Sequence, residues 1–114
     1  MSSVATGQRA EVAAAEYLRK LGYKILEQNW RTRYCEIDII AQKDKTIHFV
    51  EVKYRINDNQ GSGLDFITSA KLRQMQFAAE LWISQNDWSG DCTVGALEVA
   101  GLDFTVTNFI ADCA

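Results

Sequence analysis

The most constraining feature of this 114-residue chain is a pair of short apolar segments that carry charged side chains. The segments cover residues 36–41 and 47–54 and are rich in Ile, Val and Phe, and a polar connector over 43–46 separates them. This pattern predicts a β-hairpin. Four charged residues interrupt strands that otherwise suit burial: Glu36, Asp38, Glu51 and Lys53.

The register of the predicted hairpin decides whether the acids meet. Side chains alternate between the two faces of a strand, and a slip of one residue turns them all over. If the connector is residues 43–46, Gln42 pairs with Ile47. Asp38 then lies directly opposite Glu51, with Cβ atoms roughly 5 Å apart.

Two carboxylates at this separation are costly unless a proton or a cation lies between them. Mg²⁺ held by Asp38 and Glu51 together with substrate phosphate oxygens would resolve the conflict. Lys53, which follows Glu51 on the same face, would then position or polarise the attacking water. The alternative is ordinary cross-strand ion pairing on a solvated face, with Glu36 opposite Lys53.

The composition, with 47% hydrophobic and 24% charged residues, is typical of a soluble globular protein. The length predicts one domain over residues 1–114. No apolar run approaches the roughly 18 residues of a membrane span, and the N-terminus lacks the features of a signal peptide. We therefore expect a cytoplasmic protein without membrane association. Three scattered cysteines without metal-ligand spacing predict free thiols.

The charges are distributed unevenly along the chain. The net charge is −3, yet all 12 Lys and Arg lie within residues 1–73, and residues 74–114 contain acids but no base. The basic portion also holds the predicted hairpin. A local positive surface near the hairpin would suit binding to a phosphate backbone.

The predicted fold class is α/β, with a mixed five-stranded sheet flanked by helices in the order α-β-β-β-α-β-β. The segment 57–63 is predicted to be a loop, either a surface turn or a flap over substrate. The expected helices are residues 8–21 and 69–85, and the expected strands beyond the hairpin are residues 23–28, 93–99 and 104–110.

Further candidate residues lie on the expected helices and in the basic loop 29–34. Glu11 falls within the apolar stripe of the first helix, so it either faces solvent in the first turn or joins the ion site. Trp30 is either a packing residue or a base contact. His48 is expected to face away from Asp38, as a packed or surface residue rather than a ligand or base. The expected nucleic-acid contacts are Arg31, Arg33, Arg55, Lys71 and Arg73.

An ordered series of residues along nearly the whole chain resembles the YraN-like family. This family is similar to the PD-(D/E)XK nuclease superfamily, which has the restriction-endonuclease-like fold, and to archaeal Holliday-junction resolvases. The residues that carry the resemblance are Gly7, Ala10, Glu11, Ala14, Tyr17, Leu18, residues 22–26, Asn29, Arg31, residues 36–38, residues 49–53, Arg55, Lys71, Asn108 and Phe109.

The resemblance implies phosphodiester hydrolysis with Mg²⁺ or Mn²⁺, on DNA that is branched or flapped. Asp38, Glu51 and the Val52 backbone carbonyl would be metal ligands, Lys53 would act on the attacking water, and Glu11 would be an accessory acid and ligand. A homodimer is an option, since junction enzymes are commonly dimeric.

The chain also departs from the family pattern. Cys35 and Ala10 stand where the family usually has glycine, and residues 93–95 replace its Arg-Phe-Asp segment. Two rival functions therefore stay open. One is a nucleic-acid-binding module with a vestigial metal site, and the other is a protein-interaction domain that uses its acidic second half.

Overall fold

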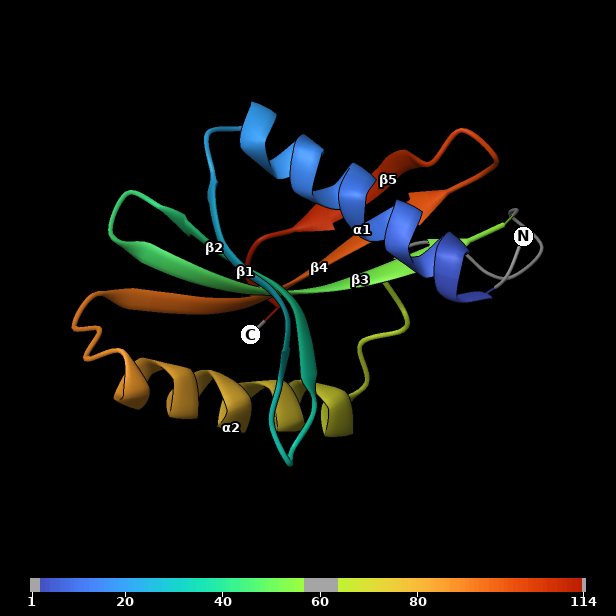
Figure 1. The fold of residues 1–114 in the computed structure, drawn as a ribbon. Helices are drawn as coiled ribbons and strands as arrows, with labels where there is room; N and C mark the ends of the chain where they lie inside the picture. The colour runs from blue at the N-terminus through green and yellow to red at the C-terminus, as the bar shows by residue number, and fades with distance from the viewer. Residues whose placement is uncertain (1–2, 57–63, 114) are drawn as a thin grey trace.

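A five-stranded mixed sheet lies between two helices in the computed structural model, which describes residues 3–56 and 64–113 (Figure 1). Strand order follows the sequence, β1-β2-β3-β4-β5, and only β3 and β4 are parallel. The predicted fold class and element order are confirmed. The segment 57–63, with its predicted loop or flap, lies outside the described residues. In chain order the elements are α1 (Ser3–Lys20), β1 (Lys24–Arg31), β2 (Glu36–Lys43), β3 (Thr46–Arg55), α2 (Ser69–Gln85), β4 (Asp91–Ala100) and β5 (Thr105–Ile110).

The two helices cover opposite faces of the sheet (Figure 1). α1 packs through small residues and Leu18 against one apolar cluster, which includes Ile39, Val50 and Leu97. α2 packs against a second cluster that includes Ile40, Phe49 and Val94. None of the described helices is long and apolar enough to cross a bilayer.

The predicted hairpin register is confirmed. Gln42 pairs with Ile47 and Ile39 pairs with Val50, although the strands continue further than expected, so that only Asp44 and Lys45 form the turn. Asp44 has a φ of 54°, a left-handed conformation that aspartate tolerates better than most residues.

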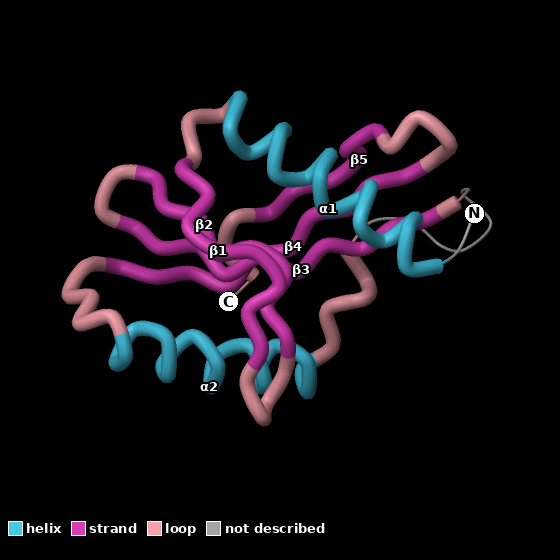
Figure 2. The backbone as a smooth tube through the Cα atoms, in the orientation of Figure 1, coloured by secondary structure: helices cyan, strands magenta, loops and turns pink. Residues whose placement is uncertain are grey.

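The alternation of faces along β2 breaks at Asp38. Ile39 packs with the α1-side cluster, whereas Ile37 and Ile40 both pack with the α2-side cluster. The β2–β3 ladder ends at the Ile39–Val50 pair. β2 continues beyond that pair with β1 alone, and the two strands form a long hairpin whose tip reaches α2 (Figure 2). The sheet therefore opens between β2 and β3 at Asp38.

The predicted boundaries of α2 are confirmed, because Thr68 caps the helix by accepting the Lys71 backbone N–H at 3.0 Å. Ala78 of this helix is buried in the core, while Gln76 is exposed. α1 begins at Ser3, earlier than predicted, and ends at Lys20, one residue before the predicted end at Leu21.

The predicted loop over residues 29–34 was wrong in its first part, because β1 runs on to Arg31. Asn29 and Arg31 resemble loop residues by type, yet Arg31 pairs with Glu36 across the hairpin. Asn29 keeps a positive φ of 55° within the strand. Trp30 is partly buried and packs against the α2-side cluster, so packing accounts for this side chain.

Candidate active site

Asp38 lies at the point where β2 leaves β3. Its Oδ2 accepts a hydrogen bond of 2.7 Å from the Val52 backbone N–H, so a side chain takes over where the ladder stops. The N–H and C=O of one strand residue point to the same edge of the strand. The Val52 carbonyl therefore faces the same opening as the Asp38 carboxyl group.

The carboxyl groups of Asp38 and Glu51 face each other in this opening, close enough to form a hydrogen bond. Burial raises the pKa of Asp38 first, and the hydrogen bond and charge of Glu51 raise it further, to about 9. The Val52 N–H opposes this rise, and the charge of Glu11 adds to it. At neutral pH the structure thus holds a proton between two acids, in a position that a cation could occupy instead.

Lys71 reaches this pair of acids from the first turn of α2. Its Nζ lies 3.0 Å from Glu51 Oε2, and the two side chains are 27% and 18% exposed, so the pair is largely shielded from water. Burial alone would lower the pKa of Lys71, but the hydrogen bond and charge of Glu51 outweigh burial and raise it. Lys71 was predicted as a nucleic-acid contact, and the structure places it on a candidate metal ligand.

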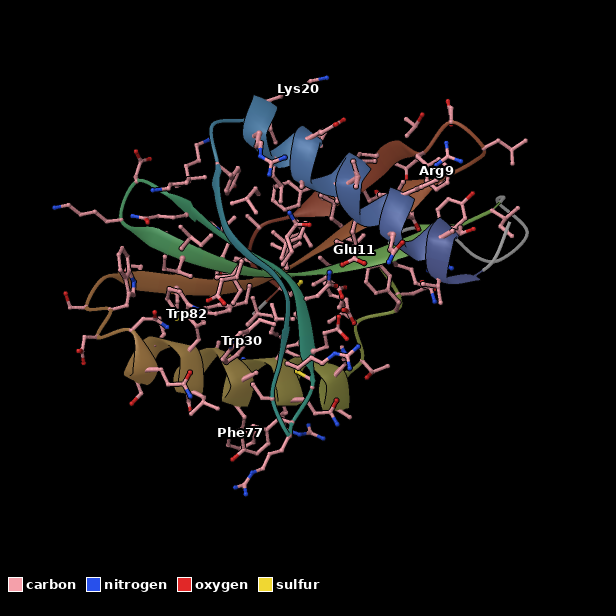
Figure 3. The ribbon with its side chains drawn as sticks, viewed as in Figure 1. Arg9, Glu11, Lys20, Trp30, Phe77 and Trp82 are labelled. Atoms are coloured by element: carbon pink, nitrogen blue, oxygen red, sulfur yellow. The ribbon has the colours of Figure 1, made fainter. Side chains whose placement is uncertain are left out.

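Glu11 approaches the acids from α1, on the other face of the sheet, and points toward β3 (Figure 3). Acceptors flank the Asn29 amide, so its nitrogen is oriented to donate to Glu11 and, at 2.9 Å, to Glu36 Oε1. Burial and the charge of Glu36 raise the pKa of Glu11, Glu51 adds to the effect, and Asn29 opposes it. The Asn29 amide therefore links Glu11 to Glu36 at the edge of the acid cluster, which comprises Asp38, Glu51, Glu11 and Glu36.

Lys53 is exposed on β3, two residues beyond Glu51 and on the same face of the strand. The expected cross-strand pair between Lys53 and Glu36 does not form among the described residues, because β2 has already left β3. The Glu36 carboxylate instead pairs with Arg31, 3.3 Å from its Nε. Lys53 therefore follows Glu51 on the same face of β3 with access to solvent.

Cys35 lies beside the same cluster and was not singled out from the sequence. Burial raises the pKa of its thiol, the Lys71 charge lowers it, and the charges of Glu51 and Asp38 raise it again. The only sequence signal was its position directly before Glu36, where the YraN-like family usually has glycine.

The donor set suits a hard divalent cation that keeps much of its hydration. Within residues 3–56 and 64–113, no three His, Cys, Asp or Glu side chains are gathered closely enough to cage an ion. The opening offers two carboxylates, Asp38 and Glu51, and the Val52 carbonyl. This matches the preference of Mg²⁺ for one or two carboxylates with water and substrate oxygens as the remaining ligands. The amide bridge places Glu11 outside that immediate set.

The basic residues predicted to contact nucleic acid are divided by the structure. Arg31, Arg33 and Arg73 are exposed. Arg55 needs correction, because it is buried at 7% exposure, and its guanidinium is held by Glu98, at 2.5 Å, and by Asp65. A side chain so enclosed is not available to a phosphate, and its ion pair with Glu98 anchors β3 to β4.

His48 packs on the α1 side of the sheet, as expected. Its Nδ1 lies 2.8 Å from Thr93 Oγ1, and the Tyr23 ring meets it edge-on. Burial lowers the pKa of His48.

The fold and this opening define an α/β protein in which adjacent strands present two facing carboxylates with lysines beside them. The chain belongs to the uncharacterised protein family UPF0102, whose model matches residues 10–106. The YraN-like resemblance is confirmed at this level.

Relatives in distant bacteria match most of the chain. A UPF0102 protein of Vibrio parahaemolyticus is 47% identical over 69% of this chain, and the match covers 65% of that protein's length. A Chlorobium chlorochromatii relative is 41% identical over 86% of this chain and 76% of its own length. A Mycobacterium tuberculosis relative is 38% identical over 76% of this chain and 70% of its own.

Proposed function

We propose that this protein is a divalent-metal-dependent nuclease of the PD-(D/E)XK type that hydrolyses phosphodiester bonds in DNA, with branched or flapped molecules as the substrate class. The observation that carries the proposal is the pair of facing carboxyl groups, Asp38 and Glu51, at the opening of the sheet. An acid whose pKa is strongly raised by burial and by a neighbouring carboxyl group, in an accessible opening, is a physical mark of a functional site.

Asp38, Glu51 and the Val52 carbonyl would hold Mg²⁺ or Mn²⁺. Such an ion supplies polarisation of the phosphate and a lowered pKa of bound water. Its arrival would take the place of the proton that Asp38 carries near pH 7, because one charge between the acids substitutes for the other.

The lysines and the helix acid would act on either side of this pair. The Lys53 ammonium would orient the attacking water and stabilise the charge that develops on the phosphate. Lys71 neutralises Glu51 while the ion is absent. Glu11 would be an accessory acid at the edge of the site, where burial and the charge of Glu36 raise its pKa.

One observation favours a second candidate function, a nucleic-acid-binding module. The Lys71 ammonium already compensates the charge of Glu51 at 3.0 Å, so the site contains a cation of its own. In this case the exposed arginines would bind the phosphate backbone of the nucleic acid, and no bond would be cleaved.

Cleavage assays separate the two functions. Labelled junction, flap and single-stranded DNA are incubated with Mg²⁺ or Mn²⁺ and with protein in excess. The nuclease predicts products that disappear in Asp38→Asn and Lys53→Ala but persist in Lys45→Ala, an exposed lysine in the hairpin turn. Salt-sensitive binding without products would support the binding module. Absence of any binding would favour a protein-interaction domain.

Titration calorimetry tests the metal site without relying on turnover. Because Asp38 holds a proton at neutral pH, binding of Mg²⁺ should release it, and the measured heat should vary with the ionisation enthalpy of the buffer. Asp38→Asn should remove both the binding and the buffer dependence. Unchanged Mg²⁺ binding by this variant would exclude Asp38 as a ligand.

A further inference from the structure

The tip of the β1–β2 hairpin and the outer face of α2 form an exposed aromatic surface beside the acid cluster. The rings of Tyr34 and Phe77 stack with centroids 5.7 Å apart. They remain 38% and 54% exposed, although large aromatic side chains normally bury most of their area. Figure 3 shows Phe77 on the side of α2 away from the sheet. The stacked pair therefore presents ring surface to solvent.

Two arginines border this aromatic pair. The Arg33 guanidinium lies 5.1 Å from the centre of the Tyr34 ring, and its Nη2 donates to the Tyr34 hydroxyl at 3.1 Å. Arg73 borders Phe77 from the preceding turn of α2. Exposed rings interleaved with arginines are the combination that binds single-stranded nucleic acid, since rings stack on bases and guanidinium groups contact phosphates.

Phe77 separates two shallow hollows. The larger, of about 390 Å³, is lined by Arg33, Tyr34, Phe77, Glu80 and Leu81. The smaller, of about 230 Å³, is lined by Arg73, Gln76, Phe77 and Glu80. Each hollow has an aromatic wall and one guanidinium, which matches a flat base with a neighbouring phosphate. Glu80 is the one acid that lines both hollows, and it would keep the phosphates toward the arginine side.

The aromatic surface is close to the acid cluster by two routes. Tyr34 directly precedes Cys35, and the Cys35 thiol is close enough to Lys71, Glu51 and Asp38 for their charges to shift its pKa. On α2, Lys71 and Phe77 are six residues apart, or about 9 Å along the axis.

We infer that Tyr34 and Phe77 form a stacking surface for an unpaired base of single-stranded DNA, next to the part of the strand whose phosphate lies at Asp38 and Glu51. The inference rests on the proposed nuclease function and adds to it the requirement for an unpaired base near the cleaved bond. It also accounts for the exposure of the aromatic pair, which packing in the core does not explain.

Fluorescence anisotropy tests the stacking surface, with EDTA present so that no strand is cut. Two labelled single strands are compared, one carrying bases and one in which the bases are replaced by abasic sites. Wild-type protein should bind the first strand about tenfold more tightly. Tyr34→Ala and Phe77→Ala should reduce this preference to near one, while Leu102→Ala, at an 88% exposed apolar residue, should keep it.

The outcomes separate this inference from the nuclease proposal. Equal binding of both strands by wild type, an unchanged preference in both variants, or no binding at all would overturn the stacking surface whatever the cleavage assay shows. A preference that depends on Tyr34 and Phe77, in a protein that cleaves nothing with any metal, would reject the nuclease and leave the surface standing. Melting curves of the variants control for folding.

Discussion

The Asp38 carboxylate accepts the Val52 backbone N–H at 2.7 Å, and so a side chain replaces a ladder bond at the point where two strands diverge. The bond fixes the carboxyl group relative to the β3 backbone. It also places the Asp38 carboxyl group at the strand edge that the Val52 carbonyl faces. Metal and catalytic sites need ligands that are held in place by their neighbours.

Replacing Asp38 with asparagine should stabilise the protein at neutral and basic pH. The folded-state pKa of Asp38 is raised from 3.8 to about 9. Between these values the folded chain holds a proton that the unfolded chain lacks, so the free energy of unfolding falls as pH rises through this window. The asparagine side chain would keep an acceptor for the Val52 N–H and remove the titration.

We expect Asp38→Asn to unfold at a higher temperature at pH 8, by several degrees for a gain of about 1 kcal/mol or more. The decline in stability between pH 4 and 9 should flatten. Asp44→Asn, in the exposed hairpin turn, is the control. A variant that follows the wild-type pH profile would show that Asp38 is ionised in the folded protein.

Lys71→Met should tighten Mg²⁺ binding in the absence of DNA. The Lys71 ammonium occupies Glu51 at 3.0 Å, and any cation at Glu51 must compete with it. Loss of an ion pair of this kind corresponds to about a two- to fivefold change in affinity. Calorimetry measures the change, with Lys20→Met on the exposed end of α1 as the control. Weaker binding would mean that Lys71 orients Glu51 for the metal rather than competing with it.

Arg55→Met should destabilise the fold without changing the salt dependence of DNA binding. The Arg55 and Glu98 side chains are 9% and 4% exposed, and breaking a buried ion pair costs about 3–5 kcal/mol. The double variant Arg55→Met with Glu98→Leu should recover part of the loss, because no charge is then left buried. Urea denaturation measures both, and Arg33→Met should change stability by less than about 0.5 kcal/mol.

The same ion pair predicts a specific acid sensitivity. Burial would raise the pKa of Glu98, but hydrogen bonds from Thr107, Asn108 and Arg55 outweigh burial and lower it. The stabilisation from Glu98 is therefore present above its ordinary pKa of 4.5 and is lost as pH falls through the lower folded-state value. An acid transition that is unaltered in the double variant would contradict this assignment.

Asn29→Ala should destabilise the protein more than Asn29→Gly. Both changes remove the amide that bridges Glu11 and Glu36, but only alanine meets the left-handed φ of 55° with a Cβ. The difference should be about 1 kcal/mol. Asp44, with a φ of 54°, supplies the matched pair of variants without neighbouring acids. Equal losses of stability in Asn29→Ala and Asn29→Gly would show that the whole effect comes from the amide bridge between Glu11 and Glu36.

Local signals in the sequence were sufficient for the hairpin and for α2. Alternating Ile and Val residues with a polar connector predicted the register that runs from Lys43–Thr46 to Ile39–Val50, and the predicted helix 69–85 has the observed bounds of α2. The prediction of a loop at Asn29 was wrong because asparagine is typical of turns, whereas here it adopts a left-handed conformation inside a strand.

The contacts of the site were less predictable because they join distant elements. The approach of Lys71 to Glu51 depends on how α2 lies on the sheet, and neither segment encodes that angle alone. Arg55 looked like a solvated charge until β4 supplied Glu98 as its partner. The stacked pair of Tyr34 and Phe77 likewise forms only because the long hairpin reaches across α2.

The strand order also has a kinetic consequence. Every neighbouring pair in the sheet is joined by a short turn except β3 and β4, which are separated by the whole stretch from Arg55 to Asp91. The largest entropy cost of loop closure therefore comes from this one parallel pairing. We expect the formation of the β3–β4 pair to limit the rate of folding. Val50→Ala on β3 should then slow refolding in stopped-flow measurements, while Val106→Ala on β5 should mainly speed unfolding.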